Sequence, residues 1–574
     1  MRRHLGGCAA LLAACSSPSP IVATPHTPAP PPTVTAPAAP SADLSIRAQQ
    51  VPEGLRVTYK LAHPIHELHF AQQAGPARAE SWRIITRGVA LDGETLKIAA
   101  PDGLRELVLL LTPDKGEYNR VYPSLVDMGP HAVMLYTRQL LGVGFEHVEM
   151  TLQASEGGNV VTSFHAAVPA LTFAPDGDKG HYVYFGPAKP ATIVGAPAVP
   201  EALATKLRSI ADRGVEFYAQ KLGEQLRTKP VVFVSYTDVD SNHTSFRGDV
   251  ASNGEISLRF HGKGWMNGST DESESRFLLH ELVHLWNGNR YRPPGEGDAW
   301  LHEGSAEYFS LLAARELSVI TPAQFDDAIA HAVNDCIENL GADRLGDEKA
   351  RGAGRVIYTC GVTAEWFADL AARPEGDVFA IWRNVFADAR KAGDAAMTRD
   401  ESLPGARDDI GNPYTVDMFL ARTRELAKTP AATALIDFLF VDPARDWSRL
   451  PALLKPLGVK LVDDRSPAWG EALRMNVLQH LLKESCKGNF GFFKFPDHVE
   501  LDTEDRCGPL SGNPMVTRAE GIDLFKAPEK ARAAVAKKCA KSGSVALQGA
   551  TGAAIKAPCS QPLEPMPRMY AIGG

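Results

Sequence analysis

Two histidines one helical turn apart constrain this chain more than any other feature of its sequence. His280 and His284 enclose Glu281 in the run His-Glu-Leu-Val-His, and Glu303 follows nineteen residues after the second histidine. A helix of 3.6 residues per turn brings residues i and i+4 onto one face, so both imidazoles can bind the same ion. With Glu303 as a third ligand, zinc keeps one open position, which is typical of catalytic rather than structural sites. The sequence therefore predicts a metallohydrolase.

The flanking residues indicate that the motif lies on helices. Ser269 and Glu272 have the spacing of a capping box. Residues 299–312 predict a second helix, which places Glu307 one turn beyond Glu303. A metal-binding histidine usually donates its other ring N–H to a carboxylate, so Glu307 is a candidate acceptor, and an ordinary surface carboxylate is the alternative. The alternative is an ordinary helix whose two histidines bind no metal. A buried helical stripe around the histidines argues against it, and its residues are Phe277, Leu278, Leu282 and Leu285.

The longer stretches around the motif resemble a known group of enzymes. Residues 280–289 read His-Glu-Leu-Val-His-Leu-Trp-Asn-Gly-Asn, and residues 300–308 read Trp-Leu-His-Glu-Gly-Ser-Ala-Glu-Tyr. They resemble the gluzincin metallopeptidases, in particular the aminopeptidase N-like family and the PDZ-containing glycyl aminopeptidase family. The eighteen residues between His284 and Glu303 match the aminopeptidase N pattern. The resemblance implies a thermolysin-like catalytic domain, one zinc ion per chain, and a peptide or protein substrate.

The resemblance also assigns roles to single residues. Glu281 is the expected general base, which takes a proton from the attacking water and passes it to the leaving amine. Tyr358 stands where these families carry a tyrosine that donates to the oxyanion, although Thr359 and Cys360 replace the Lys-Gly that usually follows. An ordinary amphipathic tyrosine at a helix start is the alternative for Tyr358. His302 is expected to be packed or exposed rather than a ligand.

One segment departs from the aminopeptidase N pattern. That family has a Gly-Ala-Met-Glu-Asn-like edge strand whose glutamate holds the free amino terminus of the substrate. The corresponding substrate strand here is residues 248–254, from Gly248 to Gly254, with Ala251 and Ser252 in place of the Glu and Asn. Asp249 and Glu255 are acidic but out of register. A buried ammonium without a carboxylate partner is costly, so amino-terminal selectivity should be lost while the strand still binds extended peptides.

The first residues predict the compartment. Residues 1–14 have a basic start and a short apolar run, and they resemble a bacterial lipoprotein signal that ends before Cys15, the expected lipid attachment site. An ordinary secretory signal is the alternative. Residues 15–41 are rich in Pro and Ala and read as a tether. We therefore expect a bacterial envelope protein on the periplasmic side, anchored in the membrane, with the outer membrane favoured by resemblance.

The remaining cysteines and the charge agree with an extracytoplasmic protein that does not bind nucleic acid. The net charge is −8, and no basic or aromatic cluster is present. Six cysteines beyond Cys15 allow fifteen pairings. We favour a Cys336–Cys360 disulfide and two disulfides among the last four, with free buried thiols as the alternative. The last four are Cys486, Cys507, Cys539 and Cys559.

The length and the strand and helix patterns predict a multidomain α+β protein. Short alternating strands fill 42–195, which we interpret as an N-terminal all-β domain. Residues 196–470 form the thermolysin-like, mostly α-helical catalytic domain. Residues 471–574 form a small C-terminal α+β domain with disulfides, which resembles a degenerate PDZ domain or is a disulfide-bonded domain of another kind.

The predicted function is zinc-dependent hydrolysis of peptide bonds. Three alternatives stay open at this point. The first is an aminopeptidase that removes amino-terminal residues, and the second is a different hydrolase on the same fold. The third is a catalytically silent peptide-binding lipoprotein, against which the intact ligands and base argue.

Overall fold

The computed structural model divides the chain into two units, Met1–Ser41 and Ala42–Gly574. The predicted signal, Cys15 and the tether lie outside the residues that the structure describes, and so do Ser252, Asn253 and Ser269. The described residues are 43–114, 122–163, 170–173, 180–189, 191–226, 230–237, 245–251, 254–263, 265, 272–292, 298–340, 345, 356–397, 412–442, 445–463, 467–486, 490–503, 507–549, 554–563, 566 and 569–573.

The first part of the described chain is built of β-sheets, as the alternating pattern predicts. In β1 the side chains alternate between buried and less buried positions, so one face of its sheet packs into the core. A six-stranded sheet has the order β12-β10-β1-β2-β7-β4, a four-stranded sheet the order β11-β13-β9-β8, and a three-stranded sheet the order β3-β6-β5. The elements are β1 Leu44–Val51, β2 Gly54–Ile65, β3 Glu67–His69, α1 Pro76–Ser81, β4 Trp82–Ile84, β5 Val89–Asp92, β6 Thr95–Ile98, β7 Leu104–Leu111, β8 Leu125–Asp127, β9 Val133–Tyr136, η1 Thr137–Leu140, β10 Val148–Gln153, β11 Asn159–Val161, β12 Ala170–Phe173 and β13 Tyr182–Gly186.

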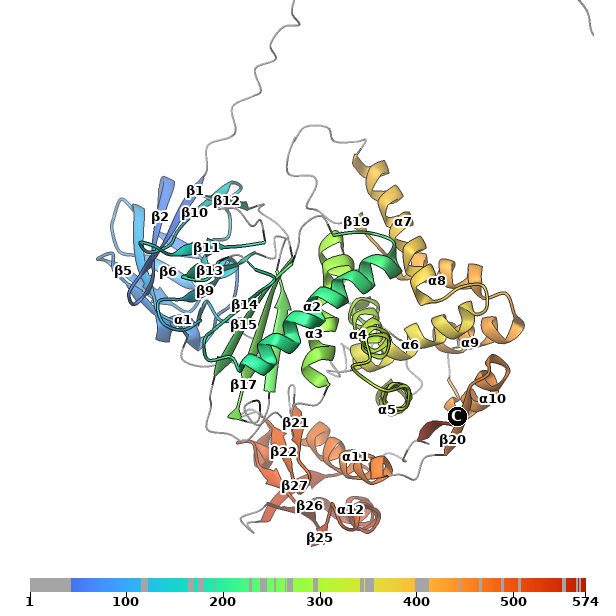
Figure 1. Ribbon diagram of the computed structural model, residues 1–574. Helices are drawn as coiled ribbons and strands as arrows, with labels where there is room; N and C mark the ends of the chain where they lie inside the picture. The colour runs from blue at the N-terminus through green and yellow to red at the C-terminus, as the bar shows by residue number, and fades with distance from the viewer. Residues whose placement is uncertain are drawn as a thin grey trace, which may run out of the picture. The chain divides into compact units, whose positions relative to one another are not determined.

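A second, mixed sheet carries the strand that borders the functional site. Its order is β14-β15-β17-β16, with the first three strands parallel and β16 antiparallel at the edge. Figure 1 shows α2 and α3 lying beside each other next to this sheet. Gly214 of α2 permits this close packing, because a Cβ there would lie 2.7 Å from a methyl carbon of Leu279. The elements are β14 Ile193–Gly195, α2 Glu201–Leu222, β15 Val231–Thr237, β16 Ser245–Val250, β17 Glu255–His261 and α3 Ser273–His284.

Of the helices that follow, α4 packs against α3, and α6 packs against α4 and α5 (Figure 1). The tightest crossing is between α4 and α6, where a Cβ on Gly304 would lie 2.3 Å from the Cα of Gly361. Only glycine at both positions allows the two backbones to approach so closely. The elements are η4 Leu285–Arg290, β18 Tyr291–Arg292, α4 Ala299–Glu316, α5 Pro322–Leu340, α6 Val356–Ala372, α7 Val378–Met397, β19 Asn412–Pro413, α8 Val416–Leu426, α9 Pro430–Phe440, η7 Trp447–Arg449, α10 Leu450–Leu454 and η8 Lys455–Leu457.

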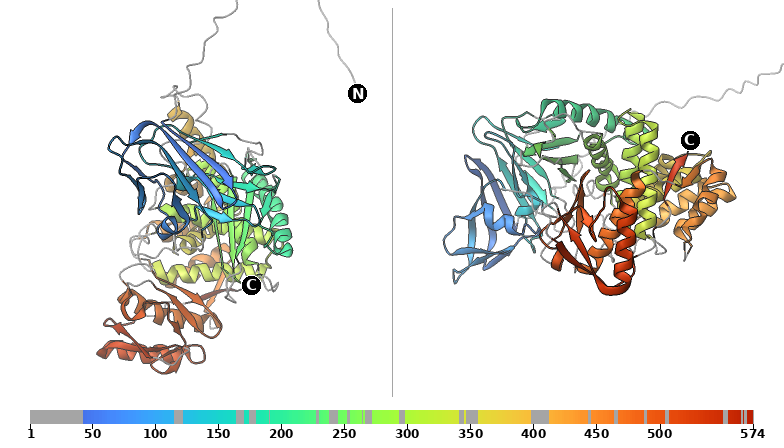
Figure 2. Two further views of the ribbon diagram at one scale, coloured as in Figure 1. Left: turned by 90° about the vertical axis from the view of Figure 1, so that its left-hand side faces the viewer. Right: turned by 90° about the horizontal axis from the view of Figure 1, so that it is seen from below.

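The C-terminal residues form a small α+β region with its own core. Figure 2 shows α11 and α12 lying beside each other, and two sheets have the orders β21-β22-β23 and β25-β24-β26-β27. The last strand, β28, pairs with β20, and Asn334 of α5 bonds the backbone of Tyr570. The elements are β20 Lys460–Asp463, α11 Pro467–Ser485, β21 Gly491–Lys494, β22 Val499–Asp502, η9 Gly508–Leu510, β23 Met515–Val516, β24 Arg518–Ala519, β25 Ile522–Asp523, α12 Pro528–Ser542, β26 Gly543–Gln548, β27 Ala554–Cys559 and β28 Tyr570–Gly573.

The described part of the chain contains three disulfides. Cys336–Cys360 joins α5 to α6, as the sequence predicts, and the last four cysteines pair as Cys486–Cys507 and Cys539–Cys559. Among the described residues, no helix combines the length and apolar character needed to cross a bilayer.

Candidate metal centre and active site

Two helices position the three candidate ligands. His280 and His284 lie on the buried face of α3, which ends at His284 and continues as the single π-helical turn η4. Short π-helical segments are frequent at functional sites. The turn places Asn287 beside the second ligand, with its Oδ1 2.9 Å from His284 Nδ1. Its Nδ2 donates to the His302 carbonyl of α4, so Asn287 links the two helices.

The ligand atoms converge on one point. His280 Nε2 and His284 Nε2 lie 3.2 Å apart, and Glu303 Oε2 lies 3.4 Å and 3.6 Å from them. Metal–ligand bonds of about 2.0–2.1 Å in a tetrahedral site imply ligand–ligand distances of about 3.3 Å. The observed distances therefore fit a zinc ion.

The outer hydrogen bonds set the tautomers of the two candidate ligand histidines. His280 Nδ1 lies 3.1 Å from Glu307 Oε2, so the nitrogen carries the proton and donates it to the carboxylate. His284 Nδ1 donates to Asn287 Oδ1 in the same way. Each neutral imidazole then presents an unprotonated Nε2, and two lone pairs face a carboxylate oxygen. These tautomers direct both Nε2 atoms and Glu303 Oε2 at one point, which is the arrangement that three metal ligands require.

Glu307 lies where the sequence predicts an acceptor for a ligand histidine. Its other oxygen accepts from Arg276 Nη2 at 2.8 Å. Burial alone would raise the pKa of the Glu307 carboxyl, but the bonds from His280 and the charge of Arg276 outweigh it and hold that pKa below its ordinary value. The carboxylate therefore stays charged and orients the His280 ring.

Glu281 and the three candidate ligands line one cavity. This cavity measures about 590 Å³, and residues of α3, α4, α6, β16 and β17 line it. The Glu281 side chain is buried, and this burial raises the pKa of its carboxyl. Gly248 of β16 passes directly beside it: a Cβ at Gly248 would lie 3.1 Å from Glu281 Oε1 and 2.6 Å from Phe277 Cζ. Glycine at this position thus lets the edge strand run beside the expected base.

Tyr358 also lines this cavity, on the side of His280. Its ring centroid is 6.1 Å from that of His280, and the side chain is 38% exposed, so its hydroxyl can reach a bound substrate. Burial of much of the ring, together with Glu303 and Glu281, raises the pKa of the Tyr358 phenol, which stays protonated as a donor. The glycine contact between α4 and α6 brings the first turn of α6 to the metal centre.

The strand wall differs in part from the prediction. Gly248 and Asp249 of β16 line the cavity, whereas Ala251 is fully buried beyond the end of β16 and Gly254 precedes β17. Glu255 is no amine anchor, because it is buried and accepts bonds from Ser163 and His181. Asp249 is different: it lines the cavity and accepts a 2.9 Å hydrogen bond from the Tyr182 hydroxyl.

Several residues of the site carry no strong signal in the sequence. Asn287 and His302 stand next to the motif but fit no ligand spacing, and His302 lines the cavity with its ring packed against that of His284. Tyr122 and Arg259 also line the cavity and come from distant segments. Their places depend on long-range packing, which local patterns do not report.

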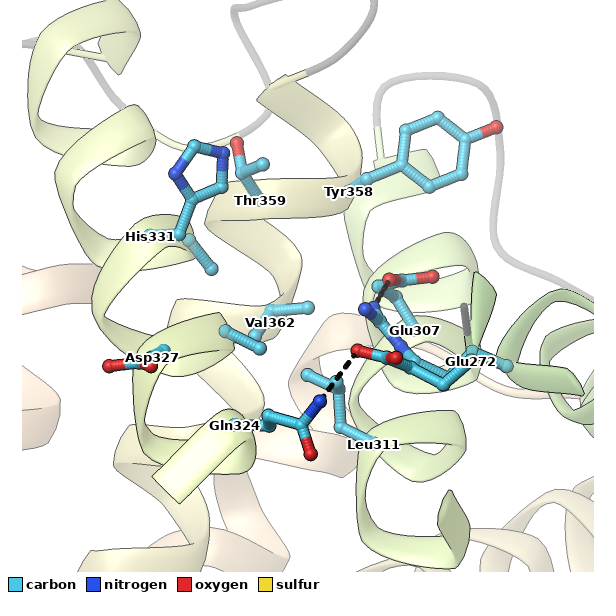
Figure 3. Close-up of a pocket in the computed structure, with 12 residues that line it drawn as sticks. Glu272, Glu307, Leu311, Gln324, Asp327, His331, Tyr358, Thr359 and Val362 are labelled. Atoms are coloured by element: carbon cyan, nitrogen blue, oxygen red, sulfur yellow. Dashed lines mark hydrogen bonds and ion pairs between the residues drawn. The ribbon is translucent and has the colours of Figure 1, made fainter. Parts of the chain in front are cut away.

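A second cavity of about 530 Å³ adjoins the first, and both are lined by Glu307 and Tyr358. Figure 3 shows Gln324 of α5 bonded to Glu272, while Thr359 and Val362 of α6 lie on another side. Leu311 and Val362 supply apolar surface, and Asp327 and His331 of α5 are exposed polar groups. The two cavities together offer room for a chain longer than a single residue.

Comparisons with known proteins agree with this geometry. A family model described as M61 glycyl aminopeptidase matches residues 274–350. Endoplasmic reticulum aminopeptidase 2 from Homo sapiens is 35% identical over 75 residues, and the Bos taurus protein is 36% identical over 72 residues. These matches cover 13% and 12% of this chain but only 7% of either relative, so the chain shares a small part of their length.

One solved structure supports the fold. An aminopeptidase N family protein from Idiomarina loihiensis aligns with a TM-score of 0.54 and 10% identity over 92% of this chain and 98% of that chain. An M1 zinc metallopeptidase from Deinococcus radiodurans has a TM-score of 0.34 and 15% identity over 70% of this chain and 92% of that chain. The predicted resemblance to the gluzincin metallopeptidases is confirmed. The chain has a multidomain fold of sheets and helices like that of the aminopeptidase N family.

Proposed function

We propose that the protein hydrolyses peptide bonds with one zinc ion held by His280, His284 and Glu303. The convergence of His280 Nε2, His284 Nε2 and Glu303 Oε2 at the spacing of metal ligands is the observation that carries this proposal. When bound, zinc would lower the pKa of a water and polarise the substrate carbonyl.

The side chains around the metal centre supply the proton transfers. Glu281 takes a proton from the attacking water at its carboxylate and returns it to the nitrogen of the leaving amine. Its buried position and raised pKa suit a group that both accepts and releases a proton. Tyr358 donates its phenol O–H to the oxygen that becomes negative as the bond breaks.

A peptide is the substrate class that the walls favour. β16 is an edge strand of its sheet among the described residues, so an extended peptide can add to it through main-chain hydrogen bonds. Gly248 keeps this strand close to Glu281. The adjoining cavity then receives the substrate residues on the Tyr358 side.

An aminopeptidase is the second candidate, and Asp249 is the observation that favours it. Its carboxylate lines the cavity and follows directly after Gly248 on the edge strand. It would hold the free amino terminus in place of the glutamate that the resembling families carry. Arg259 lines the same cavity and disfavours an ammonium there, so an endopeptidase is the rival assignment.

We further propose that the C-terminal region resembles a degenerate PDZ domain. We also propose that a lipid on Cys15 holds the protein at the periplasmic face of a bacterial membrane. The sequence of the first 41 residues supports the anchor. Labelling with a fatty acid tests the lipid anchor. We expect the unaltered chain to carry the label and the Cys15→Ala variant to lack it. Label that persists in this variant would contradict the assignment.

The first test is cleavage of a peptide library by zinc-loaded protein, measured by mass spectrometry. Half of the peptides have free amino termini and half are acetylated, and chelated protein is the blank. We expect cleavage that returns when zinc is added back. Cleavage confined to free termini selects the aminopeptidase, and cleavage of both halves selects the endopeptidase. No cleavage above the blank would contradict the proposed function.

A further inference from the structure

The second cavity, next to the metal centre, is lined mainly by residues with no role in the proposed reaction. It measures about 530 Å³, within the range of ligand pockets, and Glu307 and Tyr358 line both this cavity and the one at the metal centre. A substrate residue beside the scissile bond can therefore extend its side chain into the second cavity. The chemistry of the wall then decides which side chains are accepted.

One part of this wall is apolar. Leu311 of α4, Ala332 of α5 and Val362 of α6 are all buried and line the cavity. In the view of Figure 3, Leu311 and Val362 lie between Asp327 on one side and Glu272 on the other. A long side chain can pack its hydrocarbon stem on such a surface while its polar head group reaches the polar residues around it.

The charged groups of the wall are mainly acidic. Its described residues include three carboxylates, one guanidinium and an exposed imidazole; they are Glu272, Asp327, Glu307, Arg276 and His331. Arg276 Nη2 donates to Glu307 Oε1 at 2.8 Å, so the guanidinium is already engaged within the wall. In the part of the chain that the structure describes, Glu272 and Asp327 form no ion pair. A cationic side chain would supply the counter-charge that both lack, whereas an anionic one would meet three carboxylates.

The two carboxylates without an ion pair come from different elements. Glu272 stands directly before α3, and its Oε1 accepts a 3.2 Å hydrogen bond from Gln324 Nε2 of α5 (Figure 3). Asp327 follows Gln324 by three residues, so the two side chains lie on one face of α5. The bond from Gln324 therefore holds the Glu272 carboxylate toward the helix face that carries Asp327.

We propose that the second cavity is a subsite for a lysine or arginine side chain of the substrate. The hydrocarbon stem packs on Leu311 and Val362, and the charged head group donates to Glu272 and Asp327. Hydrogen bonds between a cation and a carboxylate are stronger than those between neutral groups. The inference rests on the proposed function and narrows its substrates to peptides with a basic residue beside the scissile bond. The two carboxylates determine specificity and take no part in bond cleavage.

A peptide series tests this subsite. The two residues on either side of the scissile bond are replaced, one position at a time, by lysine, arginine, norleucine or glutamate. Norleucine keeps a hydrocarbon stem and lacks the charge. At one of these positions we expect kcat/KM for lysine and arginine to exceed that for norleucine about tenfold, mainly through KM, with glutamate the poorest.

This preference should depend on the two carboxylates. Glu272→Gln and Asp327→Asn should each lower it about threefold, and the double variant should abolish it while kcat for the norleucine peptide is kept. Asp327→Lys should favour glutamate at the same position. Asp326→Asn is the matched control, because Asp326 precedes Asp327 on α5 but does not line the cavity, and it should keep the full preference.

The outcomes separate the subsite from the proposed function. If the zinc-loaded protein cleaves norleucine peptides and prefers lysine less than twofold at every position, the subsite is wrong and the proposed function stands. A preference that persists in the double variant would also overturn the subsite.

If the unaltered protein cleaves no peptide, the proposed function fails and binding decides. Fluorescence anisotropy then compares labelled lysine and norleucine peptides on the full chain. Tighter binding of the lysine peptide that is lost in the double variant would support the subsite, and equal binding would overturn it.

Discussion

The two walls of the metal cavity are specified in different ways. The helical wall of α3, α4 and α6 carries the ligands, Glu281, Glu307 and Tyr358, and its key spacings are four and nineteen residues. The strand wall of β16 and β17 depends on the register of a four-stranded sheet and on Tyr182 from a separate sheet. The chemistry therefore follows from local helical periodicity, and the choice of substrate follows from long-range packing.

Removing a ligand should have the largest effect on the helical wall. We expect His284→Ala to lose zinc and to lower peptide cleavage by at least about 10⁴-fold, because the ion and the oriented base act as one unit. Elemental analysis and peptide turnover measure the two losses. His331→Ala, which changes an exposed histidine of α5 in the adjoining cavity, is the matched control. If His284→Ala is fully active without bound zinc, His284 is not the metal ligand that the helical wall is expected to supply.

The role of the strand wall in substrate choice is tested at Asp249. If Asp249 holds the substrate amine, Asp249→Asn should lower the preference for free over acetylated peptides by about 10-fold to 100-fold, since a hydrogen bond to a charged group is worth about 1.5–3 kcal/mol. Asp327→Asn removes an acidic group from the adjoining cavity and should leave the ratio unchanged. If Asp249→Asn leaves the preference for free over acetylated peptides unchanged, Asp249 does not hold the substrate amine.

The contact between the two walls is tested at Gly248. A methyl group there would lie 2.6 Å from Phe277 Cζ, so we expect Gly248→Ala to destabilise the protein by about 1–3 kcal/mol and to reduce kcat/KM. Denaturant unfolding and steady-state kinetics measure these changes. Gly195→Ala lies on β14 of the same sheet, where a Cβ meets no atom within 4 Å, and should be nearly neutral. Equal stability of the two variants would contradict the close approach.

The smallest effect on peptide cleavage is expected behind the helical wall, at Glu365 of α6, where the expected change is in stability. Burial raises the pKa of its carboxyl well above 4.5, although Trp382 Nε1 donates to it. The folded protein therefore keeps a proton that the unfolded chain releases, and stability falls by up to about 1.4 kcal/mol per pH unit as the pH rises above about 4.5. Glu365→Gln lacks this slope, so it should equal the unaltered protein near pH 4.5 and exceed it at pH 8. Parallel stability profiles would show that the residue is charged when folded.

The helical wall could be predicted from the sequence more fully than the strand wall. His280, His284 and Glu303 converge as their spacing indicates, and Glu307 reaches His280 because it lies one turn beyond Glu303. The substrate strand is only partly right: β16 ends at Val250, so Ala251 and Gly254 do not line the cavity. No local pattern could report that shift, because it depends on how β16 pairs with β17.

The same reason explains the missed residues. The bond between His302 and Tyr414 spans 112 positions, and the Tyr182–Asp249 bond joins two sheets. The Cys336–Cys360 disulfide was accessible to prediction because the chain has an even number of cysteines beyond Cys15 and its first residues predict an extracytoplasmic location. Its place between α5 and α6 also helps to hold the helix that carries Tyr358.

The most direct measurement of the central claim uses one variant, Glu281→Gln, which keeps the size of the side chain and removes the base. Zinc content and peptide turnover are determined on the same preparation. The account predicts one zinc ion per chain together with turnover at least about 10³-fold below that of the unaltered protein. Turnover close to that of the unaltered protein, with zinc bound, would show that Glu281 is not the base and would contradict the account.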